Sequence, residues 1–296
     1  MLLQAQYDDP LLMSWIMPRR SLGHAISQLL LQFRIVSAVA RRELQLRAAK
    51  GLFGVAGVFL EPLALICTFL ALRILIRGAG EGTYLNLVLW LALGFIPFFM
   101  FADVAIKAIG GVQKGGDLYF YRRLRPLDSL MGTSLLTVQI FGTMMLAFVL
   151  GVSFWEWEFV VENPGRLVFL YLGIGLIGFG VGLTTLIIGH LLPIVAWVIK
   201  SFLRRILLWT SCIFFPIRQI PDEFRPFILW NPIAHGVELL RQSCNPAYPA
   251  PGVSAVYFWG WVVGSIGFGL FIYANSEELL FANEPLPGLD DGDADL

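Results

Sequence analysis

The polar residues whose spacing most suggests chemistry lie in one segment, LWNPIAHGVELLR, at residues 229–241 between strongly apolar runs. His235 and Glu238 are three residues apart, a spacing that can place two metal ligands on one helix face. No further candidate ligands lie close in sequence, so we expect no metal site. Glu238 and Arg241 have the same spacing, so the acid can support this segment through Arg241 or through a backbone donor.

The residues before this pattern predict a break in the backbone. Asn231 can cap a helix over 232–242 whose first residue is Pro232, because proline lacks the N–H group that would have no partner there. The preceding segment 226–232, PFILWNP, is apolar enough to dip into lipid. Two short helices meeting at Trp230 and Asn231 therefore predict a re-entrant hairpin. Broken backbone at membrane depth must be buried in protein or line a wet cavity, so we interpret the hairpin as the lining of the outer end of a pathway.

Other ionisable residues inside apolar runs are few. Glu61 precedes Pro62, and Asp103 lies four residues before Lys107, a spacing that allows an ion pair on one helix face. A proton-driven pump would need a longer series of acids and histidines across the bilayer, so a structural or gating role is expected for these three residues. No lysine follows a glycine, which excludes a phosphate-binding loop of the Walker type, and we expect neither enzymatic activity nor a cofactor bound by this chain.

A polar loop at 113–129, QKGGDLYFYRRLRPLDS, combines aromatic and basic residues. A short helix after its glycine pair would present Leu118, Tyr119 and Tyr121, followed by Arg122 and Arg125. We interpret this loop as a docking site for a cytoplasmic partner. An interfacial aromatic anchor with basic flanks is the alternative.

The composition places the chain in a membrane. Apolar residues make up 57% and charged residues 14%, far from the balance of a soluble domain. The net charge is zero, so no nucleic-acid partner is expected. The three cysteines are widely spaced and are expected to be small apolar residues rather than a disulfide framework.

The element pattern predicts an all-α integral membrane protein. Segments 52–76, 84–109, 129–154, 167–192, 194–217 and 253–275 are long and apolar enough for six spans, with the hairpin between spans five and six. Lys200, Arg204 and Arg205 in the fifth segment are expected to reach toward the headgroups. We expect residues 1–50 to form an N-terminal segment, of which 21–50 has the apolar periodicity of an amphipathic interface helix. Residues 51–281 are expected to form the membrane-spanning domain. Residues 282–296 are expected to form an acidic disordered tail.

The basic residues predict the orientation of the chain. With both termini inside, fifteen of the 21 lysines and arginines fall on the cytoplasmic side. Cytoplasmic loops carry the excess of basic residues, so this orientation is expected. Trp155, Trp157 and Trp230 then lie near the outer surface, either as an interfacial belt or as stacking platforms for sugar rings.

Several motifs, taken in order, resemble the permease subunits of ABC transporters that export capsular polysaccharide. They are Arg42-Glu43-Leu44 with Arg47, Leu60-Glu61-Pro62, the segment GFIPFF at 94–99, Tyr121-Arg122 with Arg125-Pro126-Leu127-Asp128, Ser211-Cys212 through Phe215-Pro216, and Leu229-Trp230-Asn231-Pro232 with His235 and Val237-Glu238-Leu239. The resemblance covers residues from about 35 to 280. Departures include the small residues before Glu61 and Arg123 where a proline is common in the family.

The resemblance implies a homodimer in the bacterial inner membrane, each subunit docked to a separate ATP-binding subunit that holds ATP and magnesium. The cargo would be an acidic polysaccharide on a lipid anchor, passed to periplasmic and outer-membrane export proteins. The loop at 113–129 would couple to the ATPase. An outer gate would be formed by the hairpin residues Trp230, Asn231, Pro232, His235, Glu238 and Arg241. The anionic headgroup of the lipid would be met by Arg41, Arg42, Arg47 and Lys50. Positive-inside anchoring explains the last four residues equally well.

Two other functions remain open from the sequence. One is a permease for another lipid-linked polymer, such as O-antigen or teichoic acid, or for a drug. The other is a membrane-embedded glycolipid transferase, which would need carboxylates at the cytoplasmic face, where Asp117 and Asp128 are the available acids.

Overall fold

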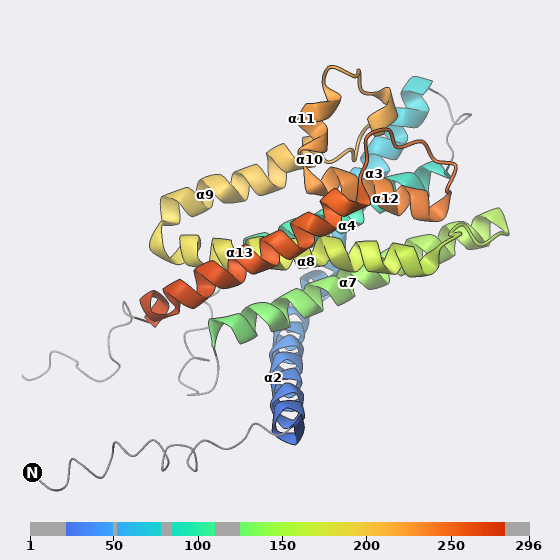
Figure 1. Ribbon diagram of the computed structural model, residues 1–296. Coiled ribbons are helices and arrows are strands. Elements are labelled where there is room, and N and C mark those ends of the chain that lie inside the picture. The colour runs from blue at the N-terminus through green and yellow to red at the C-terminus, as the bar shows by residue number, and fades with distance from the viewer. Residues whose placement is uncertain (1–21, 50–51, 78–84, 110–124, 282–296) are drawn as a thin grey trace, which may run out of the picture.

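The computed structural model describes residues 22–49, 52–77, 85–109 and 125–281 (Figure 1). Every regular element in these ranges is helical. The α-helices are α2 (Leu22–Ala48), α3 (Leu52–Arg77), α4 (Leu87–Lys107), α7 (Pro126–Glu156), α8 (Pro164–Leu191), α9 (Pro193–Ser201), α10 (Leu207–Thr210), α11 (Arg225–Leu229), α12 (Pro232–Cys244) and α13 (Ala255–Phe281). A π-helix, η1 (Phe202–Ile206), joins α9 to α10, and a 3-10 turn, η2 (Ile217–Gln219), precedes α11.

Helix α4 forms the centre of the bundle. Its side chains are apolar on all sides as far as Ala102, with Asp103 and Lys107 near its end, and Phe95, Phe98 and Met100 are fully shielded. A helix that is apolar all round must be surrounded by other elements, and α4 packs against α3, α7, α8 and α12. Its first turn is fixed by Asn86, whose Oδ1 accepts the N–H of Val88 at 2.9 Å. This core gives the outer segments a rigid support.

Glycines let α8 approach its neighbours closely. A Cβ atom at Gly180 would lie 2.4 Å from the backbone of Ser265 in α13, and one at Gly178 would lie 3.0 Å from the carbonyl oxygen of Phe101 in α4. Side chains at these positions would push the helices apart, as is typical of helix packing in lipid.

Four of the described helices are long and apolar enough to cross a membrane, namely α4, α7, α8 and α13. The predicted segment 194–217 is not one helix, because it is divided into α9, η1 and α10 and ends at Thr210. The sequence between α10 and η2 is turn, and Cys212 there has a positive φ of 54°. An all-helical membrane protein is thus confirmed in outline, whereas the six-span count stays a prediction.

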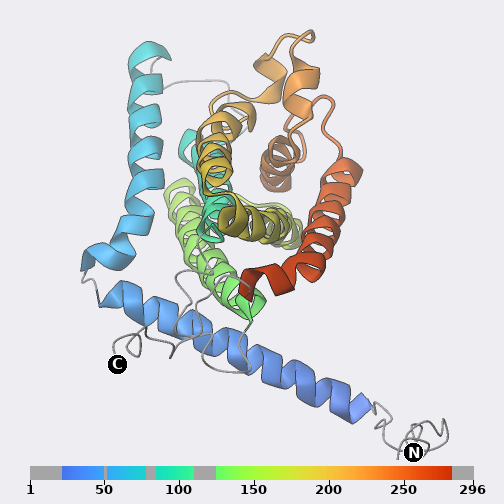
Figure 2. The same cartoon turned by 90° about the vertical axis from the view of Figure 1, so that its left-hand side faces the viewer.

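Helices α2 and α3 run across the direction of the main bundle. Figure 1 shows α2 running at a steep angle to α7, α8 and α13, and Figure 2 shows α3 standing at one side of the bundle. Helix α2 packs against α7 where Gly132 leaves room for Val39, since a Cβ atom at Gly132 would lie 2.6 Å from that side chain. The helix expected over 21–50 is therefore present, and its position at a membrane interface stays a prediction.

Candidate functional site

The most densely bonded polar site is built around α12. Asn231 caps this helix as predicted, because its Oδ1 accepts the N–H of Ile233 at 2.9 Å while Pro232 occupies the first helical position. The amide nitrogen of Asn231 donates to the hydroxyl of Ser211 at 2.9 Å and to that of Thr210 at 3.2 Å. The cap thus also ties α12 to the end of α10. The two short helices predicted to meet at Trp230 and Asn231 are α11 and α12.

Glu238 and Arg241 form an ion pair that is closed off from solvent. Their exposed fractions are both 0%, and Nη1 of Arg241 lies 3.0 Å from Oε1 of Glu238. The same carboxylate oxygen accepts the backbone N–H of Ile217 at 3.1 Å. Burial raises the pKa of the Glu238 carboxyl, while Arg241 and the Ile217 N–H act in the opposite direction.

Arg241 also explains why the predicted fifth helix stops early. Its Nη1 donates to the carbonyl oxygen of Cys212 at 2.7 Å, and its Nη2 donates to that of Trp90 at 3.3 Å. Carbonyl groups that the guanidinium holds need no helical N–H partner, so the chain can turn at Cys212 without leaving acceptors unsatisfied. Gly94 provides the space for this arrangement, since a Cβ atom there would lie 3.0 Å from Nη2 of Arg241. We call Trp90, Glu238 and Arg241, with the turn at Cys212 and Ile213, the arginine node.

His235 joins the two ends of the hairpin region. Its Nδ1 accepts the N–H of Ser254 at 2.9 Å, and its Nε2 lies 2.8 Å from the carbonyl oxygen of Leu229. A backbone N–H can only donate to an unprotonated nitrogen, so the ring is neutral with its proton on Nε2. Burial lowers the pKa of His235, which favours the same form. Both ring nitrogens are engaged, and within the described residues no group of three or more His, Cys, Asp or Glu side chains comes together.

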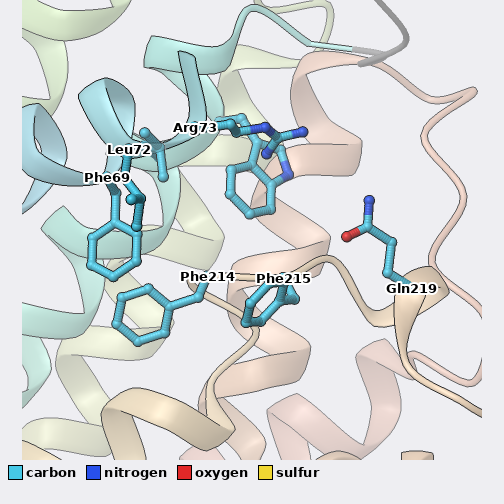
Figure 3. Close-up of a pocket in the computed structure, with 8 residues that line it drawn as sticks. Phe69, Leu72, Arg73, Phe214, Phe215 and Gln219 are labelled. Carbon is cyan, nitrogen blue, oxygen red and sulfur yellow. The ribbon is translucent and has the colours of Figure 1, made fainter. Parts of the chain in front are cut away.

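An aromatic pocket opens beside the arginine node (Figure 3). It has a volume of about 210 Å³ and is lined by Phe69, Leu72 and Arg73 of α3, Trp90 and Leu91 of α4, and Phe214, Phe215 and Gln219. The rings of Phe69 and Phe214 lie 4.4 Å apart. The three tryptophans named from the sequence are not among these lining residues, and all three are exposed.

A second, charged pocket lies where α2, α3, α4, α7 and η1 meet. It has a volume of about 390 Å³ and is lined by Glu43, Arg47, Gly57, Glu61, Pro62, Phe99, Asp103, Lys107, Phe141 and Arg204. Each cation in it has an acidic partner: Arg47 with Glu43 at 3.1 Å, Lys107 with Asp103 at 2.5 Å, and Arg204 with Glu61. The pairing predicted for Asp103 and Lys107 is confirmed.

Of the other predicted site residues, Arg47 lines the charged pocket. Leu118, Tyr119, Tyr121, Arg122 and Lys50 lie outside the described residues. Arg125 is at the start of α7, where its backbone N–H donates to Asp128 at 3.0 Å. Arg41 and Arg42 are exposed on α2, whereas Arg47 is 9% exposed, so the structure separates the basic group that the sequence suggested.

Two partners were missed from the sequence. Arg204 was expected to reach toward the headgroups, yet it pairs with Glu61 across 143 residues of chain. Trp90 was read only as part of an apolar span, although its ring lies 3.8 Å from the guanidinium carbon of Arg241. The one signal in the sequence was that charged residues, Glu61 and Arg204, lie in the first and fifth predicted spans.

Comparison with known proteins finds transport proteins that are similar to most of this chain. No protein-family model matches the chain. It is 29% identical over 250 residues to the polysialic acid transport protein KpsM of Escherichia coli, covering 84% of this chain and 95% of that protein. It is 25% identical over 217 residues to the capsule polysaccharide export inner-membrane protein BexB of Haemophilus influenzae, covering 73% of this chain and 80% of that protein. It is also 25% identical over 223 residues to the capsule polysaccharide export inner-membrane protein CtrC of Neisseria meningitidis, covering 73% of this chain and 81% of that protein.

The predicted resemblance is confirmed: this chain is a relative of the inner-membrane proteins of capsule polysaccharide export.

Proposed function

We propose that this chain is the permease subunit of an ABC exporter that carries lipid-linked capsular polysaccharide across a bacterial inner membrane. The observation that carries this proposal is the similarity to the polysialic acid transport protein over 95% of that protein's length. The four long apolar helices, α4, α7, α8 and α13, fit such a role, because a permease needs a bundle that lipid can surround.

In this proposal the subunit has six spans, with both termini in the cytoplasm. Helix α3 has 26 residues, enough to cross a hydrocarbon layer that needs about 20. The segment from α9 to α10 would be the fifth span, and the hairpin of α11 and α12 would be re-entrant. Fifteen of 21 basic residues on the inner side support the orientation.

The working unit would be a homodimer with a separate ATP-binding subunit. Helix α3 supports a dimer, because it stands at one side of the bundle and leaves Leu72 and Leu75 exposed. ATP and magnesium would be bound by the partner, which would dock on the loop containing Leu118, Tyr119, Tyr121, Arg122 and Arg125. The cargo would leave past the hairpin toward periplasmic and outer-membrane export proteins.

The test is deletion of the gene in its own host, followed by complementation with the affinity-tagged chain. We expect the deletion to remove polysaccharide from the cell surface and to leave polymer on a lipid anchor inside the cell. The tagged chain should restore export and co-purify with an ATP-binding subunit. Unchanged surface polysaccharide, or transfer of sugar by the purified chain without an ATPase, would contradict the proposal.

A further inference from the structure

The charged pocket contains a buried donor without an acceptor among the described residues. Arg47 is 9% exposed, and within the described part of the chain its Nη1 has no hydrogen-bond partner, although its Nε bonds to Glu43 at 3.1 Å. A shielded N–H group without an acceptor is destabilising, and more so when it is charged. The pocket that Arg47 lines is therefore a place where an oxygen atom from a ligand would be favoured.

Two further cations face the same space from other helices. Lys107 is the last residue of α4, and Arg204 lies in the π-helix η1. Arg204 donates to Glu61 through Nε and Nη2. The ammonium group of Lys107 has three N–H donors, and one of them contacts Asp103. Their acidic partners hold these cations in place and leave donors for a ligand. Single-turn π-helices occur frequently at functional sites.

The charge balance limits the kind of oxyanion that can bind. Glu43, Glu61 and Asp103 line the pocket together with the three cations, so its formal charge is zero. A dianion would add two negative charges beside three carboxylates, whereas an anion with one charge adds less repulsion. The diester of a phosphate carries one charge and offers oxygens to guanidinium and ammonium donors.

The surroundings indicate that this diester belongs to a lipid. Exposed Leu44 and Leu46 of α2 and exposed Leu60 of α3 stand next to lining residues in sequence. Phe99 and Phe141 form the apolar part of the lining. Gly57 keeps one side open, because nothing lies within 4 Å of a Cβ atom placed there. A ligand with acyl chains can lie along these apolar surfaces while its headgroup occupies the pocket.

We propose that the charged pocket binds the phosphodiester of a lipid headgroup through Arg47, Lys107 and Arg204. The lipid is either a bilayer phospholipid or the anchor of the exported polymer. Only the second source rests on the proposed function.

Native mass spectrometry of the delipidated, full-length chain can measure binding of phosphatidylglycerol, with diacylglycerol as the ligand that lacks the phosphate. We expect Arg47→Gln to weaken the tightest phosphatidylglycerol site about tenfold, the size expected for one charge-assisted hydrogen bond. Gly57→Leu should weaken it similarly while keeping every charge, because the added side chain fills open space. Exposed Arg34 and Gly151 supply the matched controls Arg34→Gln and Gly151→Leu, which should bind like the wild type.

Export by the same variants, measured in cells, distinguishes the two sources. If phosphatidylglycerol binding falls and surface polysaccharide also falls, the pocket serves the anchor of the cargo. If binding falls and export is unchanged, it holds a bilayer phospholipid, and this result stands even where the proposed function fails. Unchanged phosphatidylglycerol affinity in Arg47→Gln, or weakening in Arg47→Gln without weakening in Gly57→Leu, would overturn the proposal.

Discussion

The guanidinium of Arg241 lies over the indole ring of Trp90, with its central carbon 3.8 Å from the ring centroid. Both side chains are nearly inaccessible, with exposed fractions of 0% and 2%. On the same ring, Arg73 of α3 lies 5.6 Å from the centroid. A cation over an indole ring contributes about 2 kcal/mol or more when desolvated. The indole therefore connects α12, α4 and α3 at the end of the bundle where the hairpin sits.

The first prediction concerns the buried ion pair of this node. Arg241→Met leaves the Glu238 carboxylate buried without its cation and should lower the free energy of unfolding by about 3–5 kcal/mol. Replacing both residues, as Arg241→Met with Glu238→Leu, should cost clearly less than the sum of the single changes, because no uncompensated charge remains. Thermal unfolding in detergent measures each variant.

A matched control is available on the surface. Arg225 and Asp222 have the same spacing as Arg241 and Glu238, but Asp222 is 83% exposed. Asp222→Asn should change stability by no more than about 1 kcal/mol, the range of exposed ion pairs. Additive effects in the Arg241 and Glu238 series would show that the node is not coupled.

The second prediction concerns the cap. Asn231→Ala removes the acceptor for the Ile233 N–H and the donor to Ser211. Loss of a cap costs about 1 kcal/mol, and a buried unsatisfied donor about 1–3 kcal/mol. We expect the variant to reach the membrane in normal amounts and to be impaired in export, with polymer retained inside. Immunoblots of membranes and surface staining of the polysaccharide measure the two quantities. Normal export would mean that the hairpin is only an outer cover, and loss of the protein would mean that it is a folding element.

The third prediction concerns the pH dependence of stability through His235. Burial lowers the pKa of the folded form below the ordinary value, so the unfolded chain takes up its proton first as the pH falls. The free energy of unfolding should therefore decrease below about pH 6.5, the ordinary histidine value. His235→Gln keeps an acceptor and a donor but does not titrate, so its melting temperature should depend less on pH between about 5 and 7. Equal pH dependence in both proteins would contradict this assignment.

The local parts of the site could be predicted from the sequence, and the distant partners could not. The cap by Asn231 and the helix start at Pro232 follow from residue types at fixed offsets, which is why both were found. The bond from Arg241 to Trp90 joins residues 151 apart in the chain, and the pair of Arg204 with Glu61 joins residues 143 apart. The periodicity of apolar residues along a helix gives no information about contacts between residues so far apart in the chain.

The same distinction explains why the helical part of the fifth predicted span ends before residue 217. Hydropathy counts apolar residues and would extend this helix to 217, but the carbonyl groups of the turn are held by a guanidinium from a later helix. The four long helices were found because length and hydropathy suffice to identify them.

The fourth prediction concerns orientation. With both termini inside, a single cysteine at Asn163 or Pro249 should react with a membrane-impermeant maleimide in intact cells. A cysteine at Gly115 or Asp290 should react only after the membrane is opened. The natural cysteines, of which Cys67 is exposed and the other two are buried, are first replaced by serine or alanine. Labelling of the Gly115 variant in intact cells would reverse the proposed topology.

The last prediction assigns the docking of the ATP-binding subunit to the loop at 113–129. Tyr119→Asp together with Tyr121→Asp places two charges where aromatic contact is expected, and burying unpaired charges at an interface is costly. We expect the doubly changed chain to reach the membrane while losing the ATP-binding subunit on purification and losing polysaccharide export in cells. Trp157→Asp is the matched control, because Trp157 is an aromatic residue with an exposed fraction of 88% on the side expected to face outward. This control should keep the ATP-binding subunit bound, which shows that a new charge on an aromatic position does not by itself disrupt the complex. If the loop variant still co-purifies with the ATPase and supports export, the docking surface lies elsewhere, with the exposed face of α2 as the next segment to test.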